Sequence, residues 1–139
     1  MNNWKAGEKL FSSIMTERGY QVQDVSDSPQ FWKKDIDFVI TSPTSGETKT
    51  FEVKWDSRIN KTGNLFLETY SNGGKGWFEY CEADYLAYGD ARSRRFYILP
   101  LLELRERVAS KRFEVAFCGN ESCGYLVNLQ SVKDIAQPL

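Results

Sequence analysis

The sequence contains no histidine, and this absence restricts the chemistry that the protein can use. Histidine is the usual general base near neutral pH and activates most serine and cysteine nucleophiles. A four-ligand zinc site is also disfavoured, because the only remaining soft ligands are Cys81, Cys118 and Cys123. Any catalysis must therefore be carried by carboxylates and lysines.

The sequence also lacks the segments that carry a protein into or across a membrane. It has no apolar run of spanning length, and its first residues, MNNWKAGEKLF, lack the basic-then-apolar order of a secretory signal. Its three cysteines are an odd number, which is typical of free thiols in a reducing compartment. We therefore expect a cytoplasmic protein that does not associate with membranes.

Neither sign of charge is in excess. The 18 basic residues nearly balance the 19 acidic ones, so the net charge of −1 gives no global attraction to a polyanion. A site for nucleic acid must then be local. With 139 residues, of which 41% are hydrophobic, the chain can fill one core, and we expect a single domain over residues 1–139.

Apolar periodicity predicts the order of the secondary structure. Residues 4–18 have helical spacing, with Asn2 or Asn3 as a possible N-cap and Gly19 as the stop. A turn is expected at 26–30, a hairpin turn at 43–48 and a loop at 71–76. We predict strands at 20–25, 35–42, 49–55, 64–70, 84–89, 94–100, 114–118 and 125–130, and further helices at 77–83, 101–110 and 131–139, the last ended by Pro138. This order indicates an α/β domain with a mixed central sheet flanked by helices.

The stretch FEVKW, residues 51–55, places two charged residues inside an otherwise apolar strand. Side chains alternate along a strand, so Glu52 and Lys54 share one face, opposite the apolar face. In the preceding strand the same alternation puts Asp37 on the side of Glu52 and Lys54, because a slip of one residue would bury the carboxylates. A turn centred near Ser45 and Gly46 would place Asp37 opposite Lys54 and diagonal to Glu52.

Two carboxylates and a lysine on one sheet face form a chemical unit. Carboxylate oxygens are the ligands that Mg²⁺ prefers, and the ion keeps its other positions for water and phosphate. Such an ion acidifies bound water, while a nearby ammonium stabilises charge in the transition state. Glu8, on the flank of the first helix, is a possible third acid, and Glu68 on strand 64–70 is a weaker candidate.

The combination of Glu8 in the first helix, Asp37 in the second strand and Glu52-Val53-Lys54 in the third resembles the PD-(D/E)xK nuclease superfamily. The likeness covers roughly the first half of the chain. It implies a restriction-endonuclease-like αβββαβ core and a Mg²⁺-dependent endodeoxyribonuclease, with Mn²⁺ able to substitute. By this resemblance the metal would be bound by Asp37, Glu52, Glu8 and the Val53 carbonyl. The catalytic residues would be these three acids together with Lys54, the catalytic lysine.

The sequence departs from the family motif at Ile36, where proline is expected. This leaves open whether Asp35 or Asp37 is the ligand. We favour Asp37, because it precedes the apolar stretch FVI and has the appropriate facing.

The partner implied by the resemblance is DNA. Because the chain is small and has no obvious sequence-reading module, it resembles junction-resolving or phage-type nucleases, which suggests branched or phage DNA and a homodimer with two cutting sites. Most of the aromatic residues are expected in the core; Trp77, beside the glycine-rich loop, is the one that we single out as an exception. Basic residues expected to contact the DNA backbone are Lys61, Arg58, Lys75, Lys33 and Lys34.

A different class of function remains open at this stage. The same fold could serve as a catalytically inactive DNA- or protein-binding module, in which Asp37, Glu52 and Lys54 form a salt-linked polar face. Metal-dependent cleavage separates the two hypotheses.

Overall fold

The computed structural model describes residues 4–111, 113, 115–117 and 122–139. Its elements are α1 (Trp4–Glu17), β1 (Gln21–Asp24), α2 (Pro29–Trp32), β2 (Phe38–Thr41), β3 (Thr48–Asp56), α3 (Ile59–Thr62), β4 (Asn64–Ser71), β5 (Gly74–Lys75), α4 (Trp77–Tyr80), β6 (Tyr85–Asp90), β7 (Arg95–Pro100), α5 (Leu101–Ser110), β8 (Val115–Phe117), β9 (Ser122–Asn128), the 3₁₀ helix η1 (Leu129–Val132) and β10 (Gln137–Pro138). In the described part of the chain, none of the helices has both the length and the apolar character needed to span a bilayer.

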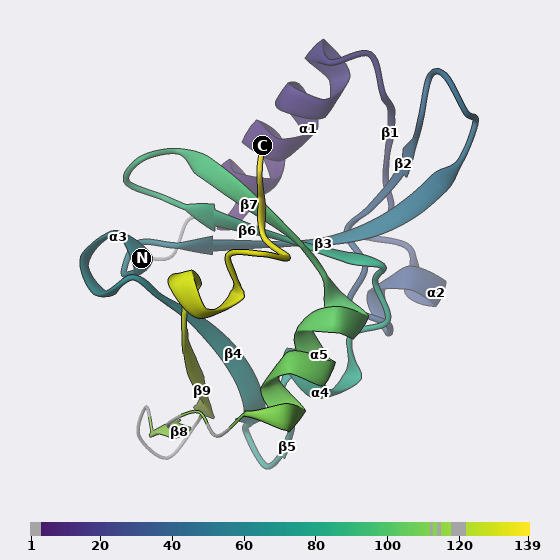
Figure 1. Ribbon diagram of the computed structural model, residues 1–139. Helices are drawn as coiled ribbons and strands as arrows, with labels where there is room; N and C mark the ends of the chain where they lie inside the picture. Colours follow the sequence, from purple (N-terminus) through teal and green to yellow (C-terminus); the bar gives the residue numbers. More distant parts are fainter. Residues whose placement is uncertain (1–3, 112, 114, 118–121) are drawn as a thin grey trace.

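The central sheet has six strands in the order β1-β2-β3-β6-β7-β10. It is mixed, because β3 and β6 run parallel while the other neighbours are antiparallel. Figure 1 shows α1 on one side of this sheet and a second sheet, β5-β4-β9-β8, with α4 and α5 on the other. The predicted α/β class with a mixed, helix-flanked sheet is confirmed; the second sheet was not predicted.

The face of the central sheet that carries the apolar residues of β3 packs against α1. Phe11 of α1 is completely buried, and its ring lies 5.3–5.6 Å from the rings of Phe38, Phe51 and Phe96. The helix approaches β3 closely at Gly7, where a Cβ atom would lie 2.8 Å from the Trp55 side chain. A larger residue at this position would push the first turn of α1 away from the sheet.

The other face of the central sheet meets the second sheet. Leu65, Leu67, Leu86 and Leu99 are fully buried between these layers. One polar link crosses the same interface, because the Tyr88 hydroxyl accepts a hydrogen bond from the backbone N–H of Phe66 (2.9 Å) and donates one to Asp56. The side of β3 that carries Glu52 and Lys54 therefore faces protein, not bulk solvent.

Several local predictions are corrected. The turn after β1 continues into α2, which begins with Pro29 at its first position, where the missing N–H costs nothing. The predicted loop at 71–76 contains β5. The helix predicted at 131–139 is wrong, because η1 ends at Val132 and β10 then pairs with Tyr97 and Ile98 of β7. Proline is tolerated there because β10 is an edge strand.

The cysteine and cap predictions are only partly covered by the structure. Cys81 and Cys123 are free, as predicted. Cys118 and the possible N-caps Asn2 and Asn3 lie outside the described residues.

Candidate active site

Glu52 and Lys54 point from β3 toward the second layer of the molecule. Glu52 is buried, with 3% of its surface exposed. The Lys54 ammonium lies 3.3 Å from Glu52 Oε1 and 3.7 Å from Asp35 Oδ2, and 27% of the lysine side chain remains exposed. The charges inside strand β3 are thus held by ion pairing at a partly open edge of the interface between the layers.

Asp37 is fastened to β3 through two hydrogen bonds. Its N–H donates to the Phe51 carbonyl (2.9 Å), and its Oδ2 accepts from the Val53 N–H (2.9 Å). The β2–β3 register pairs Phe38 with Phe51, so its continuation places Asp37 opposite Glu52. The prediction that Asp37 lies opposite Lys54 is wrong by two residues, because the turn is centred between Thr44 and Ser45; the predicted facing is unaffected.

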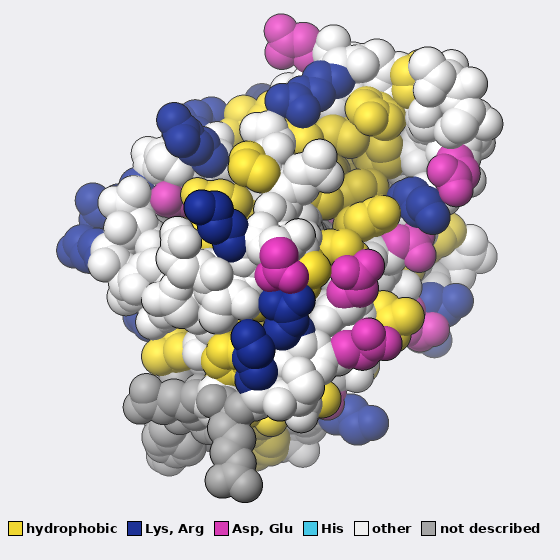
Figure 2. All heavy atoms as spheres, viewed as in Figure 1, with side chains coloured by type: hydrophobic (Ala, Val, Ile, Leu, Met, Phe, Trp, Pro, Cys, Tyr) yellow, Lys and Arg dark blue, Asp and Glu magenta, His cyan; other side chains and the backbone are white. Residues whose placement is uncertain are grey.

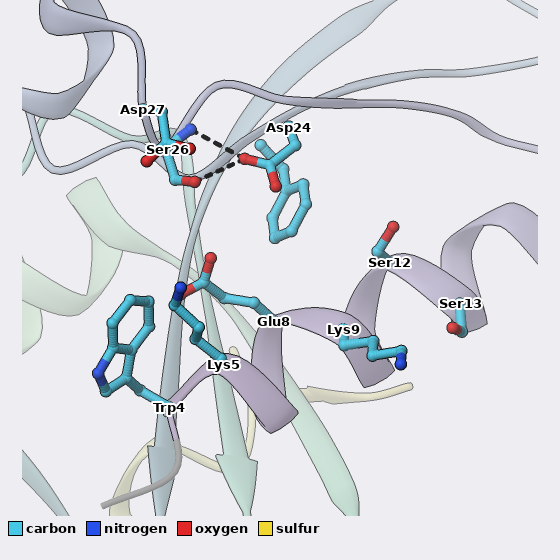
Figure 3. Close-up of a pocket in the computed structure, with 10 residues that line it drawn as sticks. Trp4, Lys5, Glu8, Lys9, Ser12, Ser13, Asp24, Ser26 and Asp27 are labelled. Atoms are coloured by element: carbon cyan, nitrogen blue, oxygen red, sulfur yellow. Dashed lines mark hydrogen bonds between the residues drawn. The ribbon is translucent and has the colours of Figure 1, made fainter.

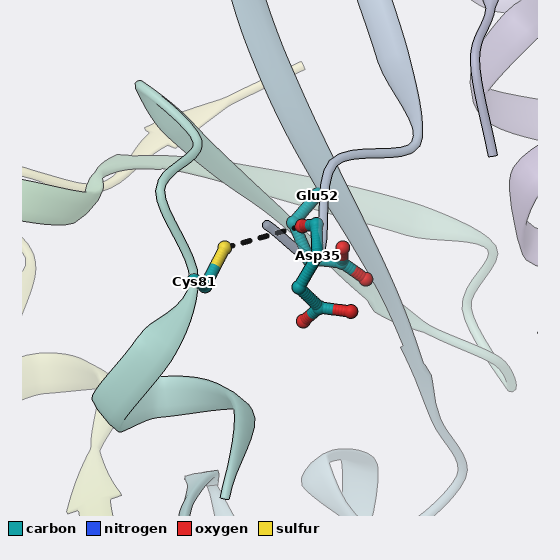
Figure 4. A group of neighbouring side chains, drawn as sticks. All are labelled: Asp35, Glu52 and Cys81. Carbon is teal, nitrogen blue, oxygen red and sulfur yellow. Dashed lines mark hydrogen bonds between the residues drawn. The ribbon is translucent and has the colours of Figure 1, made fainter. Parts of the chain in front are cut away.

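Asp35 also reaches this cluster, from the turn between α2 and β2. Its backbone has a positive φ of 56°, a conformation that aspartate tolerates better than most residues. In Figure 4 the carboxylates of Asp35 and Glu52 lie next to one another. Sequence reasoning left Asp35 open as an alternative to Asp37, and the structure brings both acids to Glu52. We call Asp35, Asp37, Glu52 and Lys54 the acidic cluster.

Cys81 lies beside the acidic cluster, but its thiol donates to a backbone carbonyl. One ligand atom each from Asp35, Glu52 and Cys81 lies within 4.8 Å of the others. The thiol, however, donates a hydrogen bond to the Asp35 backbone carbonyl (3.2 Å), as Figure 4 shows. Burial raises the pKa of Cys81 to about 12, so the sulfur stays protonated. The thiol therefore holds the Asp35 backbone, and sulfur, as a soft ligand, does not suit a hard divalent cation.

Trp77, in the first turn of α4, forms the floor under Lys54. The ammonium lies 4.7 Å from the centre of the indole ring, a distance typical of cation–π contacts. The start of α4 is held against β4, because a Cβ at Gly76 would come within 2.4 Å of the Glu68 carbonyl oxygen. The Arg105 guanidinium binds the other end through the carbonyls of Phe78 and Cys81.

The cluster is electrostatically crowded with negative charge. Burial raises the pKa of Glu52 well above its ordinary value, more than Lys54 lowers it. Burial also raises the pKa of Asp37, although hydrogen bonds from its neighbours oppose the rise. Burial by itself would lower the pKa of Lys54, but the charges of Glu52, Asp35 and Asp37 raise it overall. The three acids therefore favour a further cation in their midst.

Glu8 lies on the α1 side, in a cleft of about 370 Å³ that we call the α1 cleft. Figure 3 shows its side chain rising from α1 toward Asp24 and Ser26 at the end of β1. Burial raises the pKa of Glu8 to about 7, and the charges of Asp37 and Asp24 add to the rise. Among the described residues no hydrogen bond or ion pair joins Glu8 to the acidic cluster, so it borders the cluster and is not part of it.

Comparison with known proteins gives one similarity at the level of structure. No family model matches the sequence, and no curated protein matches it. The structure is similar to that of I-Ssp6803I, a bacterial homing endonuclease, with a TM-score of 0.52, 16% identity, and coverage of 89% of this chain and 72% of that chain. The fold is nuclease-like. At this identity the likeness concerns the fold alone.

On this nuclease-like fold the predicted DNA-contacting residues are exposed but not adjacent. Arg58 and Lys61 lie at or within α3, Lys75 lies in β5, and Lys33 and Lys34 follow α2. Figure 1 places α3, β5 and α2 at three separate edges of the molecule. Figure 2 shows Lys and Arg side chains gathered on the left, over α3 and the β6–β7 turn, whose exposed basic residues are Arg92, Arg94 and Arg95.

The donor set of the acidic cluster fits a hard divalent cation. Asp35 Oδ2 and Glu52 Oε2 are buried and have no hydrogen-bond partner among the described residues. Carboxylate oxygens of this kind suit Mg²⁺ or Mn²⁺. Glu68, the weaker candidate, lies in β4 of the second sheet, where its carboxylate accepts a hydrogen bond from the Ser122 hydroxyl (3.2 Å).

Proposed function

We propose that this protein is a divalent-metal-dependent DNA endonuclease that hydrolyses phosphodiester bonds. The observation that carries the proposal is the acidic cluster on a nuclease-like fold. Two of its buried carboxylate oxygens have no hydrogen-bond partner in the described part of the chain, and a lysine ammonium lies 3.3 Å from Glu52. Buried carboxylates are normally paired or bound to a metal. A lysine fixed beside them supplies the positive charge that phosphoryl chemistry needs.

The metal would be held by Asp37 and Glu52, with the Val53 carbonyl and Glu8 as further predicted ligands. Mg²⁺ is the expected ion, and Mn²⁺ should substitute for it. When bound, such an ion acidifies a water molecule and neutralises charge on the phosphate. The hydrogen bond from the Val53 N–H to Asp37 keeps the strand that carries these groups in register with β2.

Lys54 acts electrostatically. Because its neighbouring carboxylates raise its pKa, the amine stays protonated at neutral pH and cannot take a proton from water. The Trp77 ring and the two carboxylates restrict where the ammonium can lie. A charge held in this way stabilises an anionic transition state without reorganisation during the reaction.

The test is cleavage of supercoiled plasmid and of branched DNA with Mg²⁺ or Mn²⁺. We expect Lys54→Ala and Asp37→Ala each to lower the cleavage rate by roughly 10²- to 10³-fold. Lys49→Ala is the matched control, because Lys49 lies on the same strand but pairs with Glu47 at its other end. Undiminished cutting by both variants, or no cutting of any substrate by the parent, would refute the assignment.

A second candidate function is a nuclease-like DNA- or protein-binding module without catalysis. The ion pairs of Lys54 with Glu52 and Asp35 favour it, because charges paired in this way can have a purely structural role. This candidate predicts that the parent binds DNA, or a protein, and cuts nothing at any metal concentration. The same cleavage assay, run beside a binding titration, decides between the two.

The substrate and the assembly complete the proposal. Branched or phage DNA requires cuts in two strands, and a homodimer supplies two sites related by symmetry. Comparing cleavage of a four-way junction with that of its duplex arms tests the substrate. Sedimentation of the protein alone and of its junction complex tests the dimer.

A further inference from the structure

Within the residues that the structure describes, two carboxylate oxygens of the acidic cluster have no hydrogen-bond partner. They are Oδ2 of Asp35 and Oε2 of Glu52, both buried, and no donor in the described part of the chain reaches either atom. Glu52 is itself only 3% exposed. Leaving a buried carboxylate oxygen unpaired costs folding free energy, so such atoms call for a ligand.

The protein groups nearby are already committed to other partners. The Lys54 ammonium is closest to the other oxygen of Glu52, at 3.3 Å, and lies 3.7 Å from Asp35 Oδ2, which is beyond hydrogen-bond distance. The Cys81 thiol donates to the Asp35 carbonyl, and Asp37 Oδ2 accepts from the Val53 N–H. Among the described residues, neither the Lys54 ammonium nor the Cys81 thiol donates a hydrogen bond to either of the two oxygens.

The Asp35 backbone is held beside this point by hydrogen bonds from several segments. Its φ of 56° is unusual for a residue with a side chain. Its N–H donates to the Trp32 carbonyl (3.1 Å), its carbonyl accepts from Cys81, and the neighbouring Lys34 carbonyl accepts from the Glu82 N–H (2.9 Å). The positive φ belongs to the end of helix α2, where the N–H of Ile36 donates to the Phe31 carbonyl (3.1 Å). These contacts fix where Asp35 lies.

We propose that Asp35 is a direct ligand of the divalent cation and would hold it together with Glu52. This inference rests on the proposed function, and it adds Asp35 to the site together with Asp37, whereas the sequence left the two aspartates as alternatives. One oxygen of Asp37 accepts a hydrogen bond from β3. Asp37 would then hold β2 against β3 beside the ion, in addition to any bond that Asp37 makes to the ion.

The inference is tested by titrating the whole protein, without DNA, with Mn²⁺ and following the heat of binding. Asp35→Asn should weaken the Mn²⁺ affinity by about ten-fold or more, because the amide removes the charge that attracts the cation. Asparagine tolerates a positive φ, so the turn should be retained, and thermal unfolding of the variant checks this. Glu79→Gln is the matched control, since Glu79 is an exposed acid on α4 with the same charge change.

The outcomes are distinct from those of the cleavage assay. An Mn²⁺ affinity that is unchanged in a folded Asp35→Asn protein, or equally reduced in Glu79→Gln, overturns the inference while a parent that cuts DNA keeps the proposed function. A parent that does not bind Mn²⁺ at millimolar concentration also overturns it. Loss confined to Asp35→Asn supports it, whether or not any DNA tested is a substrate.

Discussion

Glu8, in the α1 cleft, makes the stability of the protein depend on pH. Its pKa is raised to about 7, first by burial and then by the charges of Asp37 and Asp24. The folded protein therefore holds this proton more tightly than the unfolded chain, whose glutamate keeps the ordinary value of 4.5. The resulting contribution to stability is fully present below pH 4.5 and is lost as the pH rises to about 7.

We predict that Glu8→Gln flattens part of this pH dependence. Between pH 5 and pH 8, in EDTA, the free energy of unfolding of the variant should fall less than that of the parent, because the amide has no proton to lose. Urea titrations at both pH values measure the difference. Glu17→Gln, which removes an exposed charge from the last residue of the same helix, is the control. Parallel pH profiles for Glu8→Gln and the parent would contradict the prediction.

At the scale of single elements, helix α4 determines where the Trp77 ring lies relative to Lys54. Its N-terminal neighbour Gly76 leaves no room for a side chain, since a Cβ would lie 2.4 Å from the Glu68 carbonyl oxygen. The next residue, Trp77, carries the ring on which the Lys54 ammonium rests. Any shift of α4 away from β4 must therefore move the Trp77 ring relative to the Lys54 ammonium.

Gly76→Ala should accordingly reduce both stability and cleavage. Overpacking against a backbone atom is expected to lower the free energy of unfolding by about 1–3 kcal/mol, and the displaced Trp77 should lower the cleavage rate as well. Gly74→Ala is the matched control, because a Cβ there meets nothing closer than 3.8 Å. Chemical denaturation and the plasmid assay give the two measurements. Equal behaviour of the two alanine variants would show that the close approach at Gly76 is unimportant.

The elements with strong periodicity could be predicted from the sequence, whereas two of the shortest helices, α2 and α3, could not. Helix α1, the β2–β3 hairpin and helix α5 follow patterns of burial that local sequence specifies. Helices α2 and α3 have four residues each, too few for a helical period to be visible. The assignment of β4 to a second sheet depends on its pairing with β9, about sixty residues later in the chain, which no local pattern encodes.

The sequence predicts which face of the sheet carries the candidate site, but not all of the residues that form it. Side chains alternate along β3, so Glu52 and Lys54 lie on the same face wherever the β2–β3 turn is centred. The register depends on the centre of the turn, and Asp37 is consequently opposite Glu52. Trp77 contacts Lys54 through a turn of chain that brings α4 back under β3. Its place directly after the glycine-rich loop singles out Trp77 in the sequence, but that signal does not predict the contact with Lys54.

At the scale of the whole molecule, the acidic cluster lies between two groups of exposed basic residues. Lys33 and Lys34 immediately precede Asp35 in the chain, and Lys61 lies on α3, which begins five residues after Lys54. Figure 1 shows α2 and α3 on opposite sides of the molecule. Because the net charge is −1, the proposed attraction to DNA would have to come from such local groups. A DNA strand that passes the cluster would then meet cations on both sides.

This arrangement predicts that each basic group contributes separately to DNA affinity and to its salt dependence. The double variants Lys33→Ala/Lys34→Ala and Arg58→Ala/Lys61→Ala should each reduce the slope of log K against log salt by about 2, since each lost phosphate contact removes about 0.9. Lys49→Ala, at the far end of β3, should leave the slope unchanged. Fluorescence anisotropy with a labelled junction, in Ca²⁺ to prevent cleavage, measures the slopes between 50 and 200 mM salt. If only one pair changes the slope, the strand leaves the protein on one side of the cluster; if neither does, DNA does not follow this path.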